Sequence, residues 1–329
     1  MKILYAIQGT GNGHLSRAIE LAPFLVKKAK VDFLISGKSS ELRFQYPFKY
    51  MYHGLGFYFG NNGGPQYLKS ILNIRPIRLL IDILKCPVRD YDFIISDFEP
   101  VSAWAASLRN VPCIAMSHHA SFLSMKVPRP KNISRFFEWG MKWYAPSRNH
   151  IGVHYLPYDK DIFSPVIRNE IVESQVSDKG YITVYLPAYA DEILISHFIK
   201  FPDYHWKVFS KKTDVFYKQN NIEVYPVDKE RYRKELVSCH SAIVGAGFQA
   251  TSEALFLSKK MLVVPMKAQY EQKCNAAALK KLGIAIVDHI KEDFPVRLES
   301  WLKSEKPVYP KIECGTERIV ERLFELVKI

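Results

Sequence analysis

Two glycine-rich segments of the sequence stand where a bound diphosphate could lie. Gly9-Thr10-Gly11-Asn12-Gly13-His14 follows an apolar run at the start of the chain, and Gly245-Ala246-Gly247-Phe248-Gln249-Ala250 follows another in the second half. We expect each segment to end a strand and to open a helix, the first of them near Leu15. Glycine lets the backbone approach a ligand closely, and the free N–H groups and dipole of a helix N-terminus favour anions. Both segments therefore predict anion binding at the end of a strand.

His14 is the residue of the first segment that could do acid–base chemistry. An imidazole titrates near working pH, so at a cleft it can act as a general base; the alternative is a residue that caps the helix or bonds within the loop. Asp97 follows the apolar run Phe93–Ser96. It could fix the tautomer of His14 and stabilise the imidazolium, or it could cap a loop. Glu99, two residues further on, is a competing base.

The first segment departs from the dinucleotide-binding fingerprint in two ways. His14 stands where a third glycine belongs. The second predicted strand ends in Ser36-Gly37, where an acidic residue would bind a ribose, whereas Asp32 lies at the start of that strand. Both departures argue against an NAD-dependent enzyme.

Apolar runs alternate with helical patterns along the chain. Strands are predicted at Lys2–Gln8, Val31–Ser36, Phe93–Ser96 and Cys113–Met116, and again at Tyr181–Leu186, Trp206–Phe209, Ile222–Tyr225, Ala242–Val244 and Met261–Val264. Helices are predicted at Ser16–Lys28, Ile71–Leu84 and Val101–Leu108. This alternation predicts parallel sheets covered on both faces. We therefore expect an α/β fold of two Rossmann-like domains facing each other across a cleft, with ligands beyond the carboxyl ends of the strands.

A break in this pattern sets the predicted domain boundaries. Residues 157–179 hold two prolines, few apolar clusters and mixed charges, which is typical of a linker. We predict an N-terminal, acceptor-binding domain over 1–155, a linker over 156–178 and a C-terminal, nucleotide-sugar domain over 179–310. The remaining residues, 311–329, are predicted to contain a helix that packs back on the N-terminal domain.

Residues 222–276 contain further elements with a recognisable spacing. The second glycine segment is followed by Thr251-Ser252-Glu253, by a strand that ends at Pro265, and by Gln269-Tyr270-Glu271-Gln272-Lys273-Cys274-Asn275-Ala276. This order resembles the donor-binding motif of nucleotide-sugar glycosyltransferases of the two-Rossmann (GT-B) fold. It is most similar to the peptidoglycan N-acetylglucosaminyltransferase and UDP-glycosyltransferase groups. The N-terminal glycine segment matches these groups too, with its histidine in the same place.

The resemblance implies a role for each matching residue. The predicted nucleotide-sugar site consists of Gly11, Gly13, Val227, Gly245, Gly247, Phe248, Gln249, Ala250, Glu253, Gln269, Glu271 and Gln272. Residues 247–250 would line the diphosphate, and the backbone near Val227 would meet the base. Glu253 would hold the ribose hydroxyls; the alternative is a surface carboxylate that the helix dipole favours. Gln272, with Gln269 and Glu271, would bond sugar hydroxyls, and Asn275 would be structural.

Three features depart from the pattern of these relatives. Position 245 is glycine rather than a histidine that meets a phosphate, and position 250 is alanine rather than a hydroxyl residue. Ser258 and Lys260 replace a glycine and a proline before the last strand. Phosphate binding would then depend more on backbone N–H groups. Fewer of the motif's residues then remain to identify the donor nucleotide.

Residues 121–150 combine positive charge with aromatic side chains. The segment has six basic residues, six aromatic residues and one acidic residue. Phe136, Trp139 and Trp143 belong to a wide helical stripe, and a basic aromatic helix suits an anionic lipid headgroup layer. The alternative is an ordinary helix packed on the sheet. A lipid-linked acceptor would dock here and at Phe57-Tyr58-Phe59. Nucleic-acid binding would use the same residue types, but no binding module is recognisable.

His118 and His119 follow the predicted strand Cys113–Met116 and are expected on the acceptor side of the cleft. Adjacent histidines also suggest a metal site, but no carboxylate cluster accompanies them in the sequence. An Asp-x-Asp metal motif is not evident either. We therefore expect neither a metal nor a cofactor, with the nucleotide-sugar as a substrate.

Charge and composition limit the classes of protein further. The formal net charge is +13, and residues 1–170, with 22 basic and 12 acidic side chains, account for +10 of it. A basic half indicates an anionic partner, or serves only solubility. No apolar run reaches the roughly 18 residues of a membrane span, and the five cysteines lack disulfide or zinc spacing. The first residues predict a strand rather than a signal peptide, so we expect a cytoplasmic protein, peripheral on the inner face of the plasma membrane if 121–150 binds lipid.

Together these observations predict an inverting glycosyltransferase. It would move a sugar from a nucleotide diphosphate, UDP by the resemblance, to a hydroxyl of a glycan or a lipid-linked acceptor, with His14 and Asp97 as the catalytic pair. One alternative is a nucleotide-sugar epimerase of the same fold, which needs paired carboxylates that the sequence does not clearly provide. The other is a non-catalytic protein that binds a nucleotide-sugar or an anionic lipid.

Overall fold

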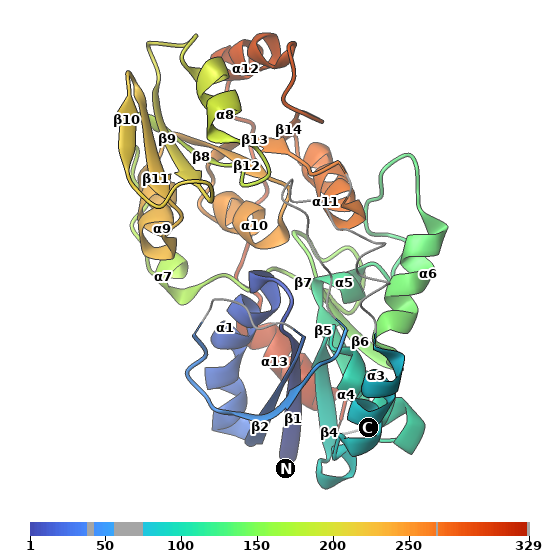
Figure 1. The fold of residues 1–329 in the computed structure, drawn as a ribbon. Helices are drawn as coiled ribbons and strands as arrows, with labels where there is room; N and C mark the ends of the chain where they lie inside the picture. Colours follow the sequence, from blue (N-terminus) through green and yellow to red (C-terminus); the bar gives the residue numbers. More distant parts are fainter. Residues whose placement is uncertain (38–42, 56–74, 268, 328–329) are drawn as a thin grey trace.

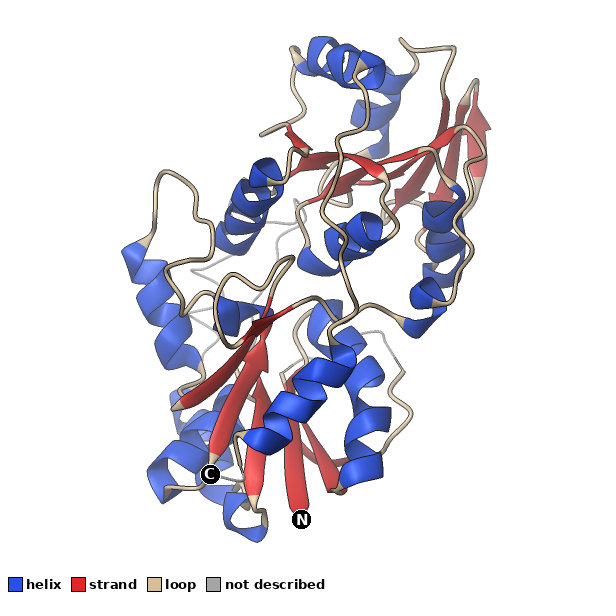
Figure 2. Cartoon of the chain, turned by 180° about the vertical axis from the view of Figure 1, so that it is seen from behind, coloured by secondary structure: helices blue, strands red, loops and turns tan. Residues whose placement is uncertain are grey.

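The chain folds into two lobes, each built on a sheet with helices around it (Figure 1). The computed structural model describes residues 1–37, 43–55, 75–267 and 269–327. Figure 2, the view from behind, shows one sheet in each lobe with helices packed between and around them. The expected α/β fold with two sheets is confirmed.

The N-terminal sheet has the strand order β3-β2-β1-β4-β5-β6-β7, and its described pairings are all parallel. The strands are β1 (Lys2–Gln8), β2 (Lys30–Ser36), β3 (Phe48–Tyr52), β4 (Phe93–Asp97), β5 (Cys113–Ser117), β6 (Asn149–Val153) and β7 (Ile162–Phe163). The helices are α1 (Asn12–Lys28), α3 (Pro76–Lys85), α4 (Pro100–Arg109), α5 (His118–Ser121) and α6 (Arg135–Tyr144), with a 3-10 turn at Val88–Asp90. The apolar residues of β1 are fully buried because this strand lies in the middle of the sheet, under α1.

The C-terminal sheet has the order β10-β11-β9-β8-β12-β13-β14, in which only the described pair β10 and β11 is antiparallel. Its strands are β8 (Tyr181–Tyr185), β9 (His205–Ser210), β10 (Tyr217–Gln219), β11 (Ile222–Pro226), β12 (Ser241–Gly245), β13 (Lys260–Val264) and β14 (Ala285–Ile286). The helices are α7 (Asn169–Val172), α8 (Asp191–Phe198), α9 (Lys229–Ser238), α10 (Phe248–Phe256), α11 (Tyr270–Lys281), α12 (Phe294–Lys303) and α13 (Thr316–Glu325).

The segments that connect the lobes lie against each other. The predicted linker, 156–178, contains β7, which pairs with β6 as the edge of the N-terminal sheet, and α7. The chain returns at Gly315, whose N–H donates to the carbonyl of Pro165 at 2.8 Å. A Cβ at Gly315 would lie 2.1 Å from the Ser164 carbonyl oxygen, so this close approach needs glycine. Beyond it, α13 packs on α1 of the first lobe (Figure 1).

The nine strands predicted from the sequence are present, with ends that differ by at most one residue. The prediction for the first helix was wrong at its start: α1 begins at Asn12, not near Leu15, so His14 is the third residue of the helix. Gly11 has φ +88°, a conformation that L side chains rarely adopt. Glycine at this position therefore allows the chain to turn directly into the helix at Asn12. The strands β3, β6, β7, β10 and β14 were not predicted, since they are short or lack a continuous apolar run.

Candidate active site

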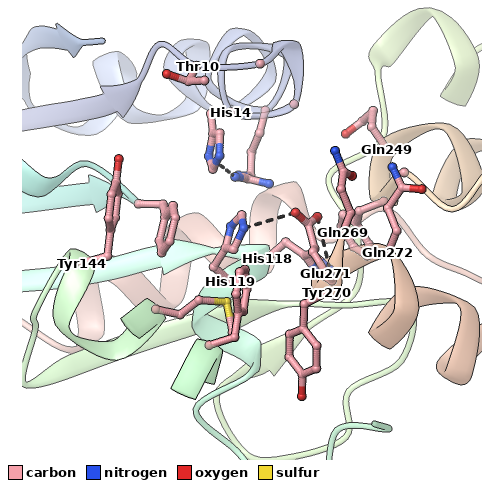
Figure 3. Close-up of a pocket in the computed structure, with 18 of the residues that line it drawn as sticks. Thr10, His14, His118, His119, Tyr144, Gln249, Gln269, Tyr270, Glu271 and Gln272 are labelled. Atoms are coloured by element: carbon pink, nitrogen blue, oxygen red, sulfur yellow. Dashed lines mark hydrogen bonds and ion pairs between the residues drawn. The ribbon is translucent and has the colours of Figure 1, made fainter. Parts of the chain in front are cut away.

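A cavity of about 630 Å³ lies between the two lobes and is lined by residues of both (Figure 3). The N-terminal lobe contributes Thr10, Gly11, Gly13, His14, Arg17, Phe98, His118, His119, Phe136, Phe137, Gly140, Met141 and Tyr144. The C-terminal lobe contributes Gly247, Phe248, Gln249, Ala250, Gln269, Tyr270, Glu271 and Gln272. The two glycine segments therefore meet at one cavity, although they are more than 230 residues apart in the sequence.

His14 and Asp97 form a hydrogen-bonded pair at this cavity. Asp97 is the last residue of β4, which pairs with β1 in the sheet, so the turn after β1 brings His14 beside it. The Nδ1 atom of His14 is 2.7 Å from Oδ1 of Asp97. A carboxylate oxygen only accepts, so Nδ1 carries the proton and Nε2, the other ring nitrogen, keeps its lone pair. The arrangement is that of a general base oriented by a carboxylate.

Arg17, one turn further along α1, binds the same carboxylate of Asp97. Its Nε donates to Oδ2 of Asp97 at 2.9 Å and its Nη2 donates to Oδ1 at 2.6 Å. Arg17 was not predicted as a site residue, although its position three residues after His14 places both side chains on one face of a helix. Because Asp97 is completely buried, the guanidinium compensates a charge that would otherwise be costly.

The environment keeps this pair in the charge state that a base requires. Burial lowers the pKa of His14 below its ordinary value of 6.5, and the nearby Asp97 only partly opposes that shift. Burial alone would raise the pKa of Asp97, but Arg17 and His14 outweigh burial and the pKa is lowered. At neutral pH Asp97 is therefore an anion and His14 is a neutral imidazole.

Glu99, the competing base, has a structural role instead. It is the N-cap of α4: its two carboxylate oxygens accept hydrogen bonds from the backbone N–H groups of Val101 and Ser102. The Ser36 hydroxyl donates to it as well. Burial raises the pKa of Glu99, and the residue does not line the cavity.

Phe98 turns the chain between Asp97 and Glu99 and forms one wall of the cavity. Its φ of 53° lies in the left-handed region, which is uncommon for a residue with a large side chain. This conformation places the Phe98 ring against His119, with ring centres 4.0 Å apart, and against Tyr144, at 4.6 Å. Tyr144 belongs to the aromatic stretch 121–150 that was predicted for the acceptor side, whereas Phe98 was not predicted and has no local signal in the sequence.

The second glycine segment presents the start of α10 to the cavity. Gly247 is the N-cap, Phe248, Gln249 and Ala250 form the first turn, and all four line the cavity. Gln249 lies across the cavity from His14 (Figure 3). No heavy atom lies within 4 Å of a Cβ built on Gly247, so the space in front of it is open. The structure thus brings the residues predicted for diphosphate binding together with the predicted base.

Three residues predicted for nucleotide binding lie outside the cavity lining. Glu253 is buried, and Arg168 donates to both of its carboxylate oxygens, at 2.7 and 2.8 Å. The backbone N–H of Val227 donates to the carbonyl of Ser210 at 3.0 Å. Gly245 is the last residue of β12. The roles of Glu253, Val227 and Gly245 stay predictions, and a ribose at Glu253 would share that carboxylate with Arg168.

The residues predicted to meet the sugar lie at the start of α11. Gln269 is its N-cap, and Glu271 and Gln272 follow in the first turn. The side-chain oxygen of Gln272 accepts from the backbone N–H of Met266 at 2.9 Å. Oε2 of Glu271 is 3.2 Å from Nε2 of His119, across the gap between the lobes (Figure 3). These three residues are therefore grouped as the sequence predicted.

His118 packs between the lobes and lines the same cavity. Its ring stacks on Phe248 at 3.8 Å between centres, its Nδ1 lies 2.8 Å from the carbonyl of Val153, and its Nε2 lies 2.8 Å from Oδ1 of Asn275. Burial lowers the pKa of His118 to about 4, although Glu271 opposes the shift. Asn275 in turn donates to the carbonyl of Ala246 at 2.9 Å, so this contact supports the second glycine segment.

The helix α6 forms the outer wall on the acceptor side. Phe136 lines the cavity and is 83% exposed, and Trp139 and Trp143 are 60% and 48% exposed. The predicted contact Phe57-Tyr58-Phe59 lies outside the described residues. Within the described ranges no helix has the length and apolar character to cross a bilayer, and no three His, Cys, Asp or Glu side chains are grouped as a metal would require.

The chain thus has two facing Rossmann-like lobes and a ligand-sized cavity between them, which places it in the class of two-domain α/β proteins. The chain matches the family model of glycosyl transferase family 1 over residues 1–304, and it therefore belongs to that family of glycosyltransferases. This confirms the family suggested by the motifs in the sequence.

Solved structures of the same fold cover nearly the whole chain. Arabidopsis thaliana UGT89C1 complexed with quercetin has a TM-score of 0.65 and 13% identity, covering 100% of this chain and 99% of that one. The same enzyme complexed with UDP has a TM-score of 0.62 and 16% identity, with both chains fully covered. MurG of Acinetobacter baumannii has a TM-score of 0.58 and 14% identity, covering 99% of each. No curated protein matches the sequence. At such identities the likeness shows the fold, which is GT-B as predicted.

Proposed function

We propose that the protein is an inverting glycosyltransferase that moves a sugar from a nucleotide diphosphate, UDP, to a hydroxyl group of an acceptor. One observation carries the proposal: the free Nε2 side of a neutral, carboxylate-bound imidazole and the start of α10 line one cavity from opposite lobes. A base and an anion site on opposite sides of a sugar are what direct displacement at the anomeric carbon requires.

The reaction follows from this geometry. His14 accepts the proton of the acceptor hydroxyl at Nε2 as the hydroxyl oxygen forms its bond to the anomeric carbon. The bond from that carbon to the diphosphate breaks, and UDP leaves with the electron pair. Asp97 stabilises the imidazolium, as a buried carboxylate does for a histidine base. Attack from the side opposite the leaving group inverts the anomeric configuration.

The leaving group is stabilised at the first turn of α10. The N–H groups of residues 247–250 have no acceptor within their own helix turn, and the helix dipole adds positive potential at the same place. In this proposal the developing charge on UDP is therefore met by backbone rather than by a metal ion, and activity should survive a chelator. Support for UDP as the nucleotide comes from the relatives, since UGT89C1 is described in complexes with UDP and with UDP-L-rhamnose.

The acceptor side favours an apolar molecule that carries the reactive hydroxyl. Phe98, Phe137, Met141 and Tyr144 line this side of the cavity, and Phe136 continues the apolar surface to the outside. We propose a lipid-linked or glycolipid acceptor, and a cytoplasmic protein held peripherally at the inner face of the plasma membrane. The exposed tryptophans of α6 and the basic residues beside them, Lys131, Lys142 and Arg148, support this placement.

The first test is a thermal-shift panel of nucleoside diphosphates and their sugars on the full chain. A ligand that binds the folded state raises the melting temperature as its concentration exceeds the dissociation constant. We expect UDP and at least one UDP-sugar to do so, and another nucleotide in its place would overturn the choice of UDP.

The second test is His14→Ala, with His289→Ala as a control outside the cavity. We expect His14→Ala to keep UDP binding and to lower sugar transfer by about 10³-fold or more, since positioned acid–base catalysis contributes factors of this order. NMR of the product from the intact protein should show the inverted anomer. Interconversion of nucleotide-sugars without transfer would favour an epimerase, and binding without any turnover would favour a binding protein.

A further inference from the structure

We propose that His119, a residue of the acceptor lobe, positions Glu271 so that one carboxylate oxygen binds a hydroxyl of an uncharged donor sugar. The inference rests on the proposed function and names a further residue of the same site. It assigns part of the donor sugar's recognition to the lobe that does not bind the nucleotide.

The two oxygens of Glu271 have different surroundings. Oε2 is 3.2 Å from Nε2 of His119, which is within reach of a hydrogen bond. Oε1 is 3.9 Å from Nε2 of His118, which is too far for one, and that nitrogen already faces Asn275. No described residue donates a hydrogen bond to Oε1, and the side chain is 31% exposed at the cavity. One oxygen is therefore held and the other is open to a ligand.

The His119 ring is held in place by stacking on two neighbouring rings. It stacks on Phe98 with ring centres 4.0 Å apart and an interplanar angle of 9°. It also lies nearly parallel to His14, with centres 5.6 Å apart. The other ring nitrogen, Nδ1, is buried and has no hydrogen-bond partner among the described residues. Nε2 is thus the ring nitrogen of His119 that lies close to a polar group, Oε2 of Glu271.

The chemistry of Glu271 identifies the class of sugar group that it can bind. Burial would raise the pKa of this carboxyl, but His119, His118 and His14 outweigh burial and lower it, so Glu271 is ionised at working pH. An ionised carboxylate only accepts hydrogen bonds. It can bind a sugar hydroxyl, and it repels the carboxylate of a uronic acid. Arg17, the one arginine of the described lining, is already bound to Asp97.

The test compares ligands with and without the sugar. Isothermal titration of the full chain would measure UDP, UDP-glucose and UDP-N-acetylglucosamine on the wild type, H119F, H119Q and E271Q. His119→Phe keeps a ring for the stack on Phe98 but removes the N–H. We expect H119F to weaken the better UDP-sugar, and to raise its KM, about tenfold, which is the size of a lost hydrogen bond to a charged group. The dissociation constant of UDP, which lacks the sugar, should not change.

Two further variants separate positioning from a general loosening of the lobes. His119→Gln can still donate from its side-chain amide and should recover most of the sugar-dependent binding. The double variant H119F/E271Q should bind the UDP-sugar no worse than E271Q, because His119 acts through Glu271. His240→Phe, which breaks an exposed pair with Asp178 away from the cavity, is the matched control and should bind like the wild type.

The outcomes distinguish this inference from the proposed function. If H119F weakens UDP and the UDP-sugar by the same factor, or if the effects of H119F and E271Q multiply, the inference is wrong and the glycosyltransferase proposal stands. If UDP-glucuronic acid binds as tightly as the neutral UDP-sugars, the assignment to an uncharged sugar is wrong. A wild type that binds no nucleotide and transfers no sugar overturns both proposals.

Discussion

The two lobes give the cavity different kinds of groups. The N-terminal lobe supplies ionisable side chains held in a buried network, with His14 bound to Asp97 and Asp97 bound to Arg17. The described lining from the C-terminal lobe is mainly backbone N–H groups and side-chain amides, with Glu271 as its ionisable carboxylate. Proton transfer needs a group whose pKa is set by its neighbours, whereas binding a diphosphate needs several donors at fixed positions. If the proposed function is right, this comparison predicts that proton transfer and diphosphate binding can be altered separately.

The glycines of the two segments also have different roles. Gly11 adopts φ +88°, so glycine is needed there for the backbone conformation that starts α1 just before His14. Gly247 has φ −68°, which any residue can adopt, and faces open space. In the first segment glycine sets the position of a side chain, and in the second it leaves room for a ligand.

The largest effect is expected from Asp97→Asn in the N-terminal lobe, which should change catalysis but not donor binding. The variant should lower kcat by about 10³-fold, because the imidazolium loses its counter-charge, while the affinity for UDP stays within about twofold. Asp97 raises the pKa of His14 and Arg17 lowers it. Removing the carboxylate therefore lowers that pKa, and the acidic limb of the pH–rate profile should move to lower pH.

Steady-state kinetics over pH 4–9 and UDP titrations would measure these quantities. Asp32→Asn is the control, since Asp32 lies in β2 at the other end of the sheet and bonds to Lys49 and Tyr91. An acidic limb that moves to higher pH would contradict the assignment of His14 as the base.

A smaller effect is expected in the C-terminal lobe from Ala250→Asp. The new carboxylate would lie in the first turn of α10, beside the expected diphosphate, and repulsion should weaken UDP binding by roughly tenfold. The folded protein should not lose stability, because an acidic residue in a first helical turn is favoured by the dipole. Titration with UDP and thermal unfolding without ligand would measure the two effects.

Ala250→Ser is the matched variant for this position, since the motif that residues 222–276 resemble implies a hydroxyl residue there. It should bind UDP at least as tightly as the wild type. Unchanged UDP affinity in Ala250→Asp would place the diphosphate away from α10.

The smallest effect is expected on the outer face of the N-terminal lobe. Replacing Trp139 and Trp143 with serine should lower binding to phosphatidylglycerol vesicles by roughly threefold, since interfacial binding scales with buried apolar area. Val308→Ser, at a residue that is 97% exposed on the other lobe, should have no effect. Co-sedimentation would measure binding, and equal binding of all three proteins would remove the membrane proposal without touching the catalytic one.

The sequence predicted the parts of the site that depend on single elements. The central strands are continuous apolar runs, so their ends could be placed to within one residue, and His14 and Asp97 follow two such strands. The resemblance in residues 222–276 located the residues at the start of α11. The positions of His14 and Asp97 needed only the rule that ligands lie beyond the carboxyl ends of parallel strands, whereas the residues of α11 needed the resemblance.

The parts that the sequence did not predict depend on how elements pack together. Arg17 reaches Asp97 only because β1 and β4 are neighbours, and Arg168 reaches Glu253 from the connection between the lobes. The contact of His119 with Glu271 joins residues 152 positions apart. Such pairs have no local spacing in the sequence, since each partner is brought into place by the packing of the lobes.

The close approach of Gly315 to Ser164 and Pro165 bears on how the enzyme would admit its substrates. The chain passes between the lobes twice, and a hydrogen bond from Gly315 to Pro165 joins the two connecting segments. Because this hydrogen bond ties one crossing to the other, we expect the two connections to move together when the lobes move apart. Such a motion would widen the entrance of the cavity, with the contact at Gly315 as its hinge.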